Sequence, residues 1–519
     1  MEKSLFKAKW FWLLLVLGMF VRIATAIFNY GYLALDDYYI LFFSVPAQSA
    51  SLAVIDPVTS VPEIRSLLPD LLIRCVAKVA YLLGFADPLD QIRAVFVVLG
   101  IFSSITLLVG YRYLSFLFDS ESKEARKNGY ETWIPLTGLF LLSLHFLMPF
   151  VSTRALIESM SAPFLLLSAY YASRYWTSEK DADIARSVLW CSISALFRFQ
   201  AGICILPIAG IVIYKSIKQN KFRQSAVLIA SGMFAFFLTG LPDLIFRGSF
   251  HSSLIAYLKY NLSHSSEYGT SPWFAYVPSV LGASLFPFLI GKYTDFRWKI
   301  TYGGLFPALL YASIFLFFHS CVPHKEERFL LPIFPILLVL AAPLFAYWWD
   351  KRKSVLDPRI VSFFTLNFLL LGFLSFFTIQ NNVIGLVRYL NRNSDVQDVY
   401  VYKDSVPHLP VSYAYRSPLR TLEPVTEMDE NHLPKIRNFN PYDACSTAFV
   451  VRKDYFLNGI DPEMPWRLEA EFASSPLEEF VVSLNPAKNG RRSSIYLFRF
   501  DDCSTAAGRE KSRISGPVR

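Results

Sequence analysis

Two adjacent carboxylates, Asp36 and Asp37, follow the first long apolar run of the sequence. Their neighbours within Leu35–Tyr39 are apolar or aromatic, a setting that raises the pKa of a carboxyl group toward the working range of a general base. A helix cap is the simpler interpretation of such a pair. As chemistry, the pair predicts a general base that either aspartate could supply.

A second charged segment, His324–Phe329, reads His-Lys-Glu-Glu-Arg-Phe. It places His324, Lys325 and Arg328 beside two acids, and such a group of cations suits a phosphate. Arginine binds a phosphate through two parallel hydrogen bonds, and lysine acts as a point charge. A run of charges that stops an apolar helix at a membrane boundary is the alternative interpretation.

A third segment runs from Asn261 to Trp273 and is rich in hydroxyl groups. Hydroxyls followed by an aromatic ring suit a sugar ligand, so the segment predicts a glycan-binding loop. An ordinary loop that anchors the chain at a membrane interface is the simpler interpretation. Asn261–Ser263 also forms an N-glycosylation sequon.

The elements that must position these segments belong to a membrane protein. Of the 519 residues, 54% are apolar and only 18% are charged, and the mean hydropathy is +0.37. Soluble globular domains carry about a quarter charged residues, so an ordinary soluble enzyme is excluded. Six scattered cysteines indicate neither a metal site nor a dense disulfide framework.

Apolar runs account for most of the first 379 residues. Runs of about 20 residues, long enough to cross a ~30 Å hydrocarbon core, are found at 10–28, 93–116, 132–151, 153–173, 187–199, 200–214, 225–247, 273–291, 300–320, 329–348 and 360–379. The runs at 187–199 and 200–214 could instead form one long helix, which would reverse every later span. Two separate spans place most loop lysines and arginines on one side of the membrane, so we expect eleven spans. The net charge of +9 then reflects topology and not nucleic-acid binding.

Outside the spans we expect a long outer loop at 29–92 and a soluble domain at 380–503. Residues 63–83 have helical apolar spacing and predict an amphipathic helix on the outer interface. The first run is expected to stay as a span, although Ala24–Ala26 would also suit signal-peptidase cleavage. The tail at 504–519 is polar and predicts disorder.

Short alternating runs in the C-terminal region predict strands near Val399–Tyr402, Ala448–Val451 and Ser494–Phe500. The fold class is therefore an α-helical polytopic membrane protein with a small mixed α/β domain on its outer side. Cys445 and Cys503 both fall in this domain and could pair in an oxidising compartment.

Many ionisable residues fall in the outer half of a predicted span or just beyond it. They are Arg22, Asp36, Asp37, Arg65, Arg93, Arg154, Glu158, Arg198, Asp243, Lys325, Glu326, Glu327 and Arg328. Each alone could be an interfacial side chain or a helix cap. Because charge inside a bilayer is costly, so many on one side predict a shared polar cavity.

These segments, in this order, resemble the membrane mannosyltransferases of the glycosylphosphatidylinositol-anchor and asparagine-linked glycan pathways. His324–Phe329 matches the family signature His-Lys-Glu-x-Arg-Phe, and Lys259–Tyr276 is similar to its loop Phe-Asn…Tyr-Gly-x-x-Pro-Trp-x-x-Tyr. Asp36 and Asp37 stand where the family has Asp followed by Glu. Further similar blocks are Arg65–Pro69, Thr153–Arg154 and Phe197–Phe199. The resemblance covers about residues 10–380 and is greatest to the enzymes that add the third mannose of the anchor.

The resemblance implies the superfamily C glycosyltransferase fold and an inverting transfer of mannose from polyprenyl (dolichyl) phosphate mannose to a lipid-linked or anchor-type glycan, giving an α-mannoside. It favours Asp36 as the base. The donor phosphate would be bound by His324, Lys325, Arg328 and Arg198. The glycan would be bound by Arg65, Arg154, Glu158, Asn261, Tyr268, Gly269, Trp273 and Glu326.

No divalent metal is expected, because the outer side offers one acidic pair and a cation cluster in place of ligands at chelating spacing. We expect no cofactor, a monomer, and three partners: the lipid-linked donor, a membrane-bound acceptor and the bilayer. The expected location is the endoplasmic reticulum membrane with a lumenal site, or a bacterial inner membrane with a periplasmic site.

A lipid-linked sugar flippase and a non-catalytic membrane subunit are the competing hypotheses. Transporters of this kind place polar groups near the bilayer midplane and show internal repeats. Here the polar groups gather toward one side and no repeat is evident, so the sequence favours the transferase. The C-terminal region alone supports a structural subunit.

Overall fold

In the computed structural model, the chain forms two compact units. The structure describes residues 2–29, 31–32, 63–118, 130–264, 266–267, 269–283, 296–351, 357–393, 395–402, 421–425, 446–453 and 466–500. The first unit comprises Met1–Phe28, Val54–Ile73 and Val95–Phe376, and the second comprises Asn29–Ala53, Arg74–Ala94 and Phe377–Arg519. Asp36, Asp37, Tyr268, Cys445, Cys503 and the tail at 504–519 lie outside the described residues.

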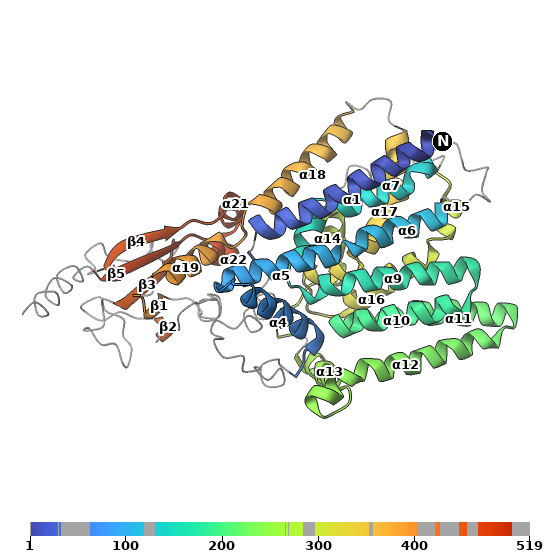
Figure 1. Cartoon of the computed structure of the whole chain (residues 1–519), viewed down its shortest axis with the longest axis horizontal. Coiled ribbons are helices and arrows are strands. Elements are labelled where there is room, and N and C mark those ends of the chain that lie inside the picture. Colours follow the sequence, from blue (N-terminus) through green and yellow to red (C-terminus); the bar gives the residue numbers. More distant parts are fainter. Residues whose placement is uncertain are drawn as a thin grey trace, which may run out of the picture. The chain divides into compact units, whose positions relative to one another are not determined.

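Helices build the described part of the first unit (Figure 1). They are α1 (Glu2–Phe28), α6 (Ile105–Phe118), η2 (Tyr130–Trp133), α7 (Ile134–Leu144), α8 (Leu147–Thr153), α9 (Ile157–Ser178), α10 (Asp181–Phe197), η3 (Phe199–Cys204), α11 (Ile205–Gln219), α12 (Phe222–Arg247), α13 (Ser252–His264), η4 (Trp273–Ala275), α14 (Tyr276–Ala283), α15 (Trp298–Gly303), α16 (Phe306–Cys321), η6 (Glu327–Ile333), α17 (Phe334–Asp350) and α18 (Pro358–Phe376). Two more helices, α4 (Leu67–Leu82) and α5 (Pro88–Ser103), have residues in both units. Helix α4 lies where the amphipathic helix was predicted.

Among the described residues, six helical segments are long and apolar enough to cross a membrane, or seven if one bent pair counts as a span. They are Lys7–Phe28, Pro88–Phe118, Phe199–Gln219, Phe222–Arg247, Glu327–Asp350 and Pro358–Arg392, with the bent pair Tyr130–Leu144 and Leu147–Thr153. The predicted runs at 153–173, 187–199 and 300–320 fall on α9, α10 and α16, which do not meet both the length and the hydropathy needed. The count of eleven spans stays a prediction.

The ambiguous run at 187–214 forms two helices with a break at Arg198. The backbone of Arg198 is extended, with φ −142° and ψ 105°, and the chain resumes as η3 and α11. Near the far end of α11, Lys215 Nζ donates to the carbonyl of Trp176 at 2.5 Å and to Glu179 at 2.9 Å. Because Glu179 lies only two residues before α10 begins, α11 must run back alongside α10. The two-helix interpretation is confirmed.

The predicted span at 132–151 is bent by 58° between α7 and α8. A break inside an apolar bundle leaves backbone groups that need partners. The buried Asn367 amide supplies them: its Nδ2 donates to the carbonyl of Leu144 at 2.8 Å, and its Oδ1 accepts from the N–H of Phe146 at 2.9 Å. Arg22 also donates to the carbonyl of Leu142, at 2.8 Å.

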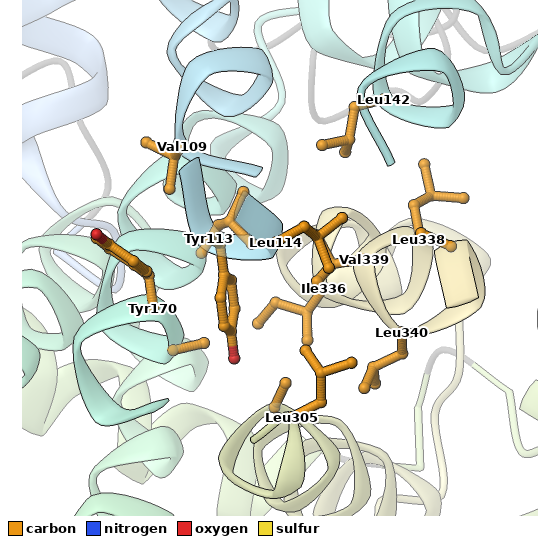
Figure 2. Packing of buried hydrophobic residues seen from close by; sticks show 14 of the residues in the cluster. Val109, Tyr113, Leu114, Leu142, Tyr170, Leu305, Ile336, Leu338, Val339 and Leu340 are labelled. Carbon is orange, nitrogen blue, oxygen red and sulfur yellow. The ribbon is translucent and has the colours of Figure 1, made fainter. Parts of the chain in front are cut away.

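The apolar core of the first unit lies where α6, α7, α9 and α17 meet, and Figure 2 shows Tyr113, Tyr170 and Ile336 packed within it. Helices α6 and α7 approach closely through glycines. A Cβ at Gly110 would come within 2.1 Å of Leu142 Cδ1, and one at Gly138 within 2.1 Å of Leu114 Cδ1. Small residues at such contacts let membrane helices pack tightly.

The second unit contains a five-stranded mixed sheet. Its strands are β1 (Asp398–Tyr402), β2 (Thr421–Val425), β3 (Thr447–Arg452), β4 (Trp466–Phe472) and β5 (Ile495–Phe500), in the order β2-β1-β3-β5-β4. Strand β1 is parallel to β2 and β3, whereas β5 is antiparallel to β3 and β4. The predicted strands coincide with β1, β3 and β5. Helices α19 (Asn381–Arg392), α21 (Pro476–Leu484) and α22 (Pro486–Asn489), with η10 (Gly490–Arg492), complete its described elements.

Candidate active site

Glu326 is the centre of the charged segment that connects α16 to η6. Its carboxylate accepts hydrogen bonds from Arg328 Nε at 2.6 Å and Nη2 at 3.0 Å, and its Oε1 lies 2.9 Å from His324 Nε2. The backbone of Glu326 is extended (φ −131°), and η6 begins at the next residue, so Arg328 belongs to the first turn of η6. The paired contacts fix the plane of the Arg328 guanidinium.

Lys325 joins this segment to the hydroxyl-rich loop. Its Nζ donates to the carbonyl of Ser271 at 3.0 Å and to that of Val322 at 2.6 Å. The N–H of Ser271 in turn donates to the carbonyl of Pro323 at 3.0 Å. Two segments that the sequence identified separately are therefore in direct contact.

A second ion pair lies beside the first and shares an aromatic ring with it. The Arg198 and Arg328 guanidinium groups lie 5.0 Å and 5.4 Å from the centroid of the Phe329 ring. Arg198 Nη1 is 3.2 Å from Oε1 of Glu158, which is in the first turn of α9. The break between α10 and η3 brings Arg198 to this position.

The Arg198–Glu158 pair joins a buried carboxylate to a largely buried guanidinium, and it is incompletely hydrogen-bonded. The Glu158 side chain is 1% exposed, and neither of its carboxylate oxygens accepts a hydrogen bond from a described residue. The Arg198 side chain is 11% exposed, and its guanidinium donates no hydrogen bond within the described part of the chain. Buried charges are usually fully hydrogen-bonded, so this pair has capacity for a polar ligand.

Tyr257 on α13 is a neighbour of this pair that the sequence did not identify. Its ring lies 5.4 Å from that of Phe199. Burial raises the pKa of the Tyr257 phenol, and the charge of Glu158 raises it further, whereas Arg198 lowers it. The phenol is therefore neutral at physiological pH and can donate a hydrogen bond. Helical spacing offered the one available signal, because Tyr257 is four residues before Asn261.

Two other predicted glycan-binding residues, Arg154 and Arg65, contact residues outside the Glu326 cluster. Arg154 is fully buried, with its guanidinium carbon 4.2 Å and 4.7 Å from the rings of Phe96 and Phe150. The carbonyl of Arg65 accepts from Arg247 Nη1 at 3.2 Å. These contacts tie Arg154 and Arg65 to helix packing.

Three more predicted residues lie on or after α13. Asn261 Nδ2 donates to the carbonyl of Tyr257 at 2.8 Å. Gly269 has φ +90°, which favours glycine, and Trp273 is 72% exposed. Together with the Ser271 contacts, these positions make an exposed edge beside the charged segment.

Among the described residues there is no group of three or more His, Cys, Asp or Glu side chains that could hold a metal ion. That search does not include Asp36 and Asp37. The expectation that no metal is needed stays a prediction.

Residues 59–414 match the Alg9-like mannosyltransferase family. This range contains the Glu326–Arg328 pair, the Glu158–Arg198 pair and the hydroxyl-rich loop at 261–273. The chain belongs to the Alg9-like mannosyltransferase family. With its long apolar helices, this Alg9-like chain is a multi-pass membrane protein.

Two curated relatives show how far the similarity extends. A Drosophila melanogaster protein, Dol-P-Man:Man(7)GlcNAc(2)-PP-Dol alpha-1,6-mannosyltransferase, is 27% identical over 44% of this chain and 32% of its own length. GPI mannosyltransferase 3 of Saccharomyces cerevisiae is 22% identical over 61% of this chain and 54% of its own length. The Alg9-like chain thus spans about half the length, or less, of these relatives.

The fold is similar to that of a protein of known structure, ArnT. The apo structure of ArnT from Cupriavidus metallidurans has a TM-score of 0.58 and 12% identity, and covers 99% of this chain and 100% of that one. The same protein bound to undecaprenyl phosphate gives a TM-score of 0.55, over 94% and 98%. At this identity the likeness shows the fold of the Alg9-like chain and nothing of its substrate.

Proposed function

We propose that this chain is an inverting mannosyltransferase. It transfers mannose from a polyprenyl (dolichyl) phosphate mannose donor to a hydroxyl of a lipid-linked or anchor-type glycan and forms an α-mannoside. Membership in the Alg9-like family supports the reaction class. The observation that carries the proposal is the largely buried Arg198 guanidinium, which is paired with Glu158 but donates no hydrogen bond to a described residue, beside an Arg328 that Glu326 orients.

The donor phosphate binds between the guanidinium groups of Arg198 and Arg328, which both lie close to the Phe329 ring. Arg328 is oriented by Glu326, so little conformational entropy is lost when it meets a phosphate. Lys325 adds positive charge on the same segment, and the imidazole of His324 lies against Glu326 there. The two arginines and Lys325 stabilise the negative charge that develops on the phosphate as the bond to the sugar breaks.

The transfer is a single displacement at the anomeric carbon. Asp36, or its neighbour Asp37, removes the proton of the acceptor hydroxyl as the hydroxyl oxygen attacks. The bond between the anomeric carbon and the phosphate oxygen breaks, and its electron pair leaves with the polyprenyl phosphate. Inversion converts a β-linked donor into an α-linked product.

The acceptor glycan binds next to the donor, at a site that exposed and buried residues share. Its proposed contacts are Arg65, Arg154, Glu158, Asn261, Tyr268, Gly269, Trp273 and Glu326. Glu158 and Glu326 also orient the arginines of the donor site: Glu158 pairs with Arg198, and Glu326 with Arg328. The reaction needs no metal, since a monophosphate leaves and the cations of the donor site can neutralise it.

The proposed site faces the endoplasmic reticulum lumen or, in a bacterial cell, the periplasm. The C-terminal domain lies on the same side, and the protein acts as a monomer.

The proposal is tested by giving the purified full-length chain radiolabelled dolichyl phosphate mannose and a panel of lipid-linked acceptors. We expect α-linked transfer from this donor and none from GDP-mannose. Asp36→Asn or Asp37→Asn should lower turnover by about 10²–10⁴-fold, with donor affinity nearly intact. Glu179→Gln, a change of an acid outside the site, is the matched control. Transfer from GDP-mannose alone would overturn the donor class, and full turnover in both Asn variants would overturn the base.

Activity after exhaustive chelation tests the metal prediction. We expect no change, because the cations neutralise the leaving phosphate. A loss that an added divalent ion restores would contradict this and would make the acidic pair a metal site.

A further inference from the structure

Helix α21 of the second unit exposes large apolar side chains along one face. Leu477, Phe480 and Leu484 are 37%, 59% and 68% exposed. Their spacing of three and four residues places them on the same side of the helix. Several large apolar side chains exposed on one side of a short helix are typical of a binding surface.

The orientation of this stripe is fixed by contacts on the buried side of α21. Glu478 is 4% exposed, and its Oε1 accepts from the N–H of Gln380 at 2.8 Å. Its Oε2 accepts from the N–H and Oγ of Ser475 at 3.3 Å and 2.8 Å, which completes a capping box at the start of the helix. The stripe therefore faces away from the unit's own core.

Basic residues follow the helix directly in the sequence. Lys488, Arg491 and Arg492 belong to α22 and η10, and the carbonyl of Arg492 accepts from Ser474 Oγ just before α21. The Asn489 amide also donates to the carbonyl of Val481, at 3.3 Å. The segment that carries the basic residues is thus packed against α21, and its charge complements anionic lipid headgroups.

The covalent chain keeps α21 close to a membrane surface. Gln380, which is hydrogen-bonded to Glu478, is four residues beyond Phe376, the last residue of apolar helix α18. Four residues of chain span at most about 14 Å. Helix α1 is linked to the same segment. Asn29, one residue after α1 ends, accepts a hydrogen bond at its Oδ1 from the N–H of Ile379 at 3.2 Å.

We propose that α21 is an interfacial anchor that inserts Leu477, Phe480 and Leu484 into the headgroup region of the membrane that the apolar helices cross. The following segment is basic in sequence and favours anionic lipid at this interface. A helix with one apolar and one polar face and adjacent basic charge has the composition of elements that lie in the membrane interface. The anchor holds the second unit against the bilayer.

Photo-crosslinking on the full-length chain in lipid nanodiscs tests this anchor. Benzoylphenylalanine is placed at Phe480 or, as a matched control, at Leu468, an apolar residue of β4 that is 47% exposed. After irradiation, we expect at least five-fold more lipid adduct at position 480 than at 468. The yield at 480 should rise further when phosphatidylglycerol replaces part of the phosphatidylcholine, because the basic segment favours anionic lipid.

Positions 484 and 483 give a second test and control for lipid crosslinking, so the result does not depend on a single variant. Leu484 should form lipid adducts, whereas its exposed polar neighbour Ser483 should form several-fold fewer. Equal adduct yields at the test and control positions would overturn the proposal. Adducts at 480 and 484 to protein, whether to another part of the chain or to a second copy, would overturn it too.

Discussion

Two charged clusters lie at opposite ends of the α9–α10 helix pair. One contains Glu158 at the start of α9 and Arg198 just after α10, and the other contains Glu179 and Asp181 between the two helices. Helix α9 has 22 residues, so the two ends are about 30 Å apart. The clusters are similar in composition but differ in how well their charges are bonded.

At the Glu179 end, hydrogen bonds satisfy the carboxylates. Glu179 accepts from Lys215, Gln219 and Lys221 at 2.9, 2.5 and 3.4 Å, and Asp181 accepts from Arg223 Nε at 2.8 Å. At the other end, Glu158 is more deeply buried, yet no described residue donates a hydrogen bond to its carboxylate. A satisfied cluster stabilises the helix pair, whereas a buried, under-bonded one is suited to a ligand.

The largest expected effect is on transfer activity, which should depend on the Glu158 end of the α9–α10 pair and not on the Glu179 end. Arg198→Ala should lower kcat/KM for the lipid donor by about 10²-fold, because a donor to the developing phosphate charge is lost. Lys215→Ala should change kcat/KM by less than about two-fold, because Lys215 serves only the satisfied cluster. Steady-state transfer assays on folded protein measure both. Equal losses in the two variants would break the comparison.

Glu158→Gln is expected to have a smaller effect, about ten-fold on kcat/KM. The neutral amide keeps the shape but no longer holds the Arg198 guanidinium by charge, so its position becomes less defined. Glu179→Gln is the matched change at the other end and should leave transfer intact. A Glu158→Gln enzyme with full activity and a normal donor KM would show that the pair is structural.

Stability should show the reverse pattern. Lys215→Ala removes a largely buried amine from Glu179 and from the carbonyl of Trp176, at a cost of about 1 kcal/mol. The melting temperature of this 519-residue chain should then fall by about 1 °C. Thermal unfolding of both proteins in the same nanodiscs measures this. Glu158→Gln should unfold at the wild-type temperature, because the carboxylate oxygens that it alters accept no hydrogen bond from described residues, and a fall as large as that of Lys215→Ala would argue for a structural pair.

The smallest effect is a pH dependence at the satisfied end. Hydrogen bonds from Lys215 and Gln219 lower the pKa of Glu179 to about 2. A lowered folded-state pKa contributes stability above the ordinary value of 4.5, and this is lost as pH falls from 4.5 toward 2. Melting temperatures between pH 5 and pH 3 should therefore fall more steeply in the wild type than in Glu179→Gln. Parallel curves would show that these bonds do not stabilise the folded state.

Local sequence pattern was sufficient for much of the fold. Apolar length located the helices, and alternation located β1, β3 and β5, because both signals depend on neighbours within one element. Charge balance favoured two helices across 187–214, and the break at Arg198 bears this out. The bend after Leu144 could not be foreseen, since its amide partner, Asn367, is 223 residues further along the chain.

Local sequence pattern also predicted part of the candidate site, whereas contacts between distant elements were not predicted. The motif at 324–329 predicted a cation cluster, but not that Glu326 orients two of its members. Nothing in the sequence indicated that the Phe329 ring is shared by Arg198 and Arg328, because that contact joins separate elements. The contact between the Arg65 carbonyl and Arg247 could not be foreseen either, since the two residues are 182 positions apart in the chain.

The central claim is that the donor phosphate binds at the under-bonded end, between Arg198 and Arg328. Equilibrium binding of radiolabelled dolichyl phosphate mannose, measured without acceptor, tests it most directly. We predict that Kd rises about ten-fold or more in Arg198→Ala and in Arg328→Ala, and stays at the wild-type value in Lys215→Ala. Unchanged affinity in both arginine variants, with normal melting temperatures, would contradict the claim.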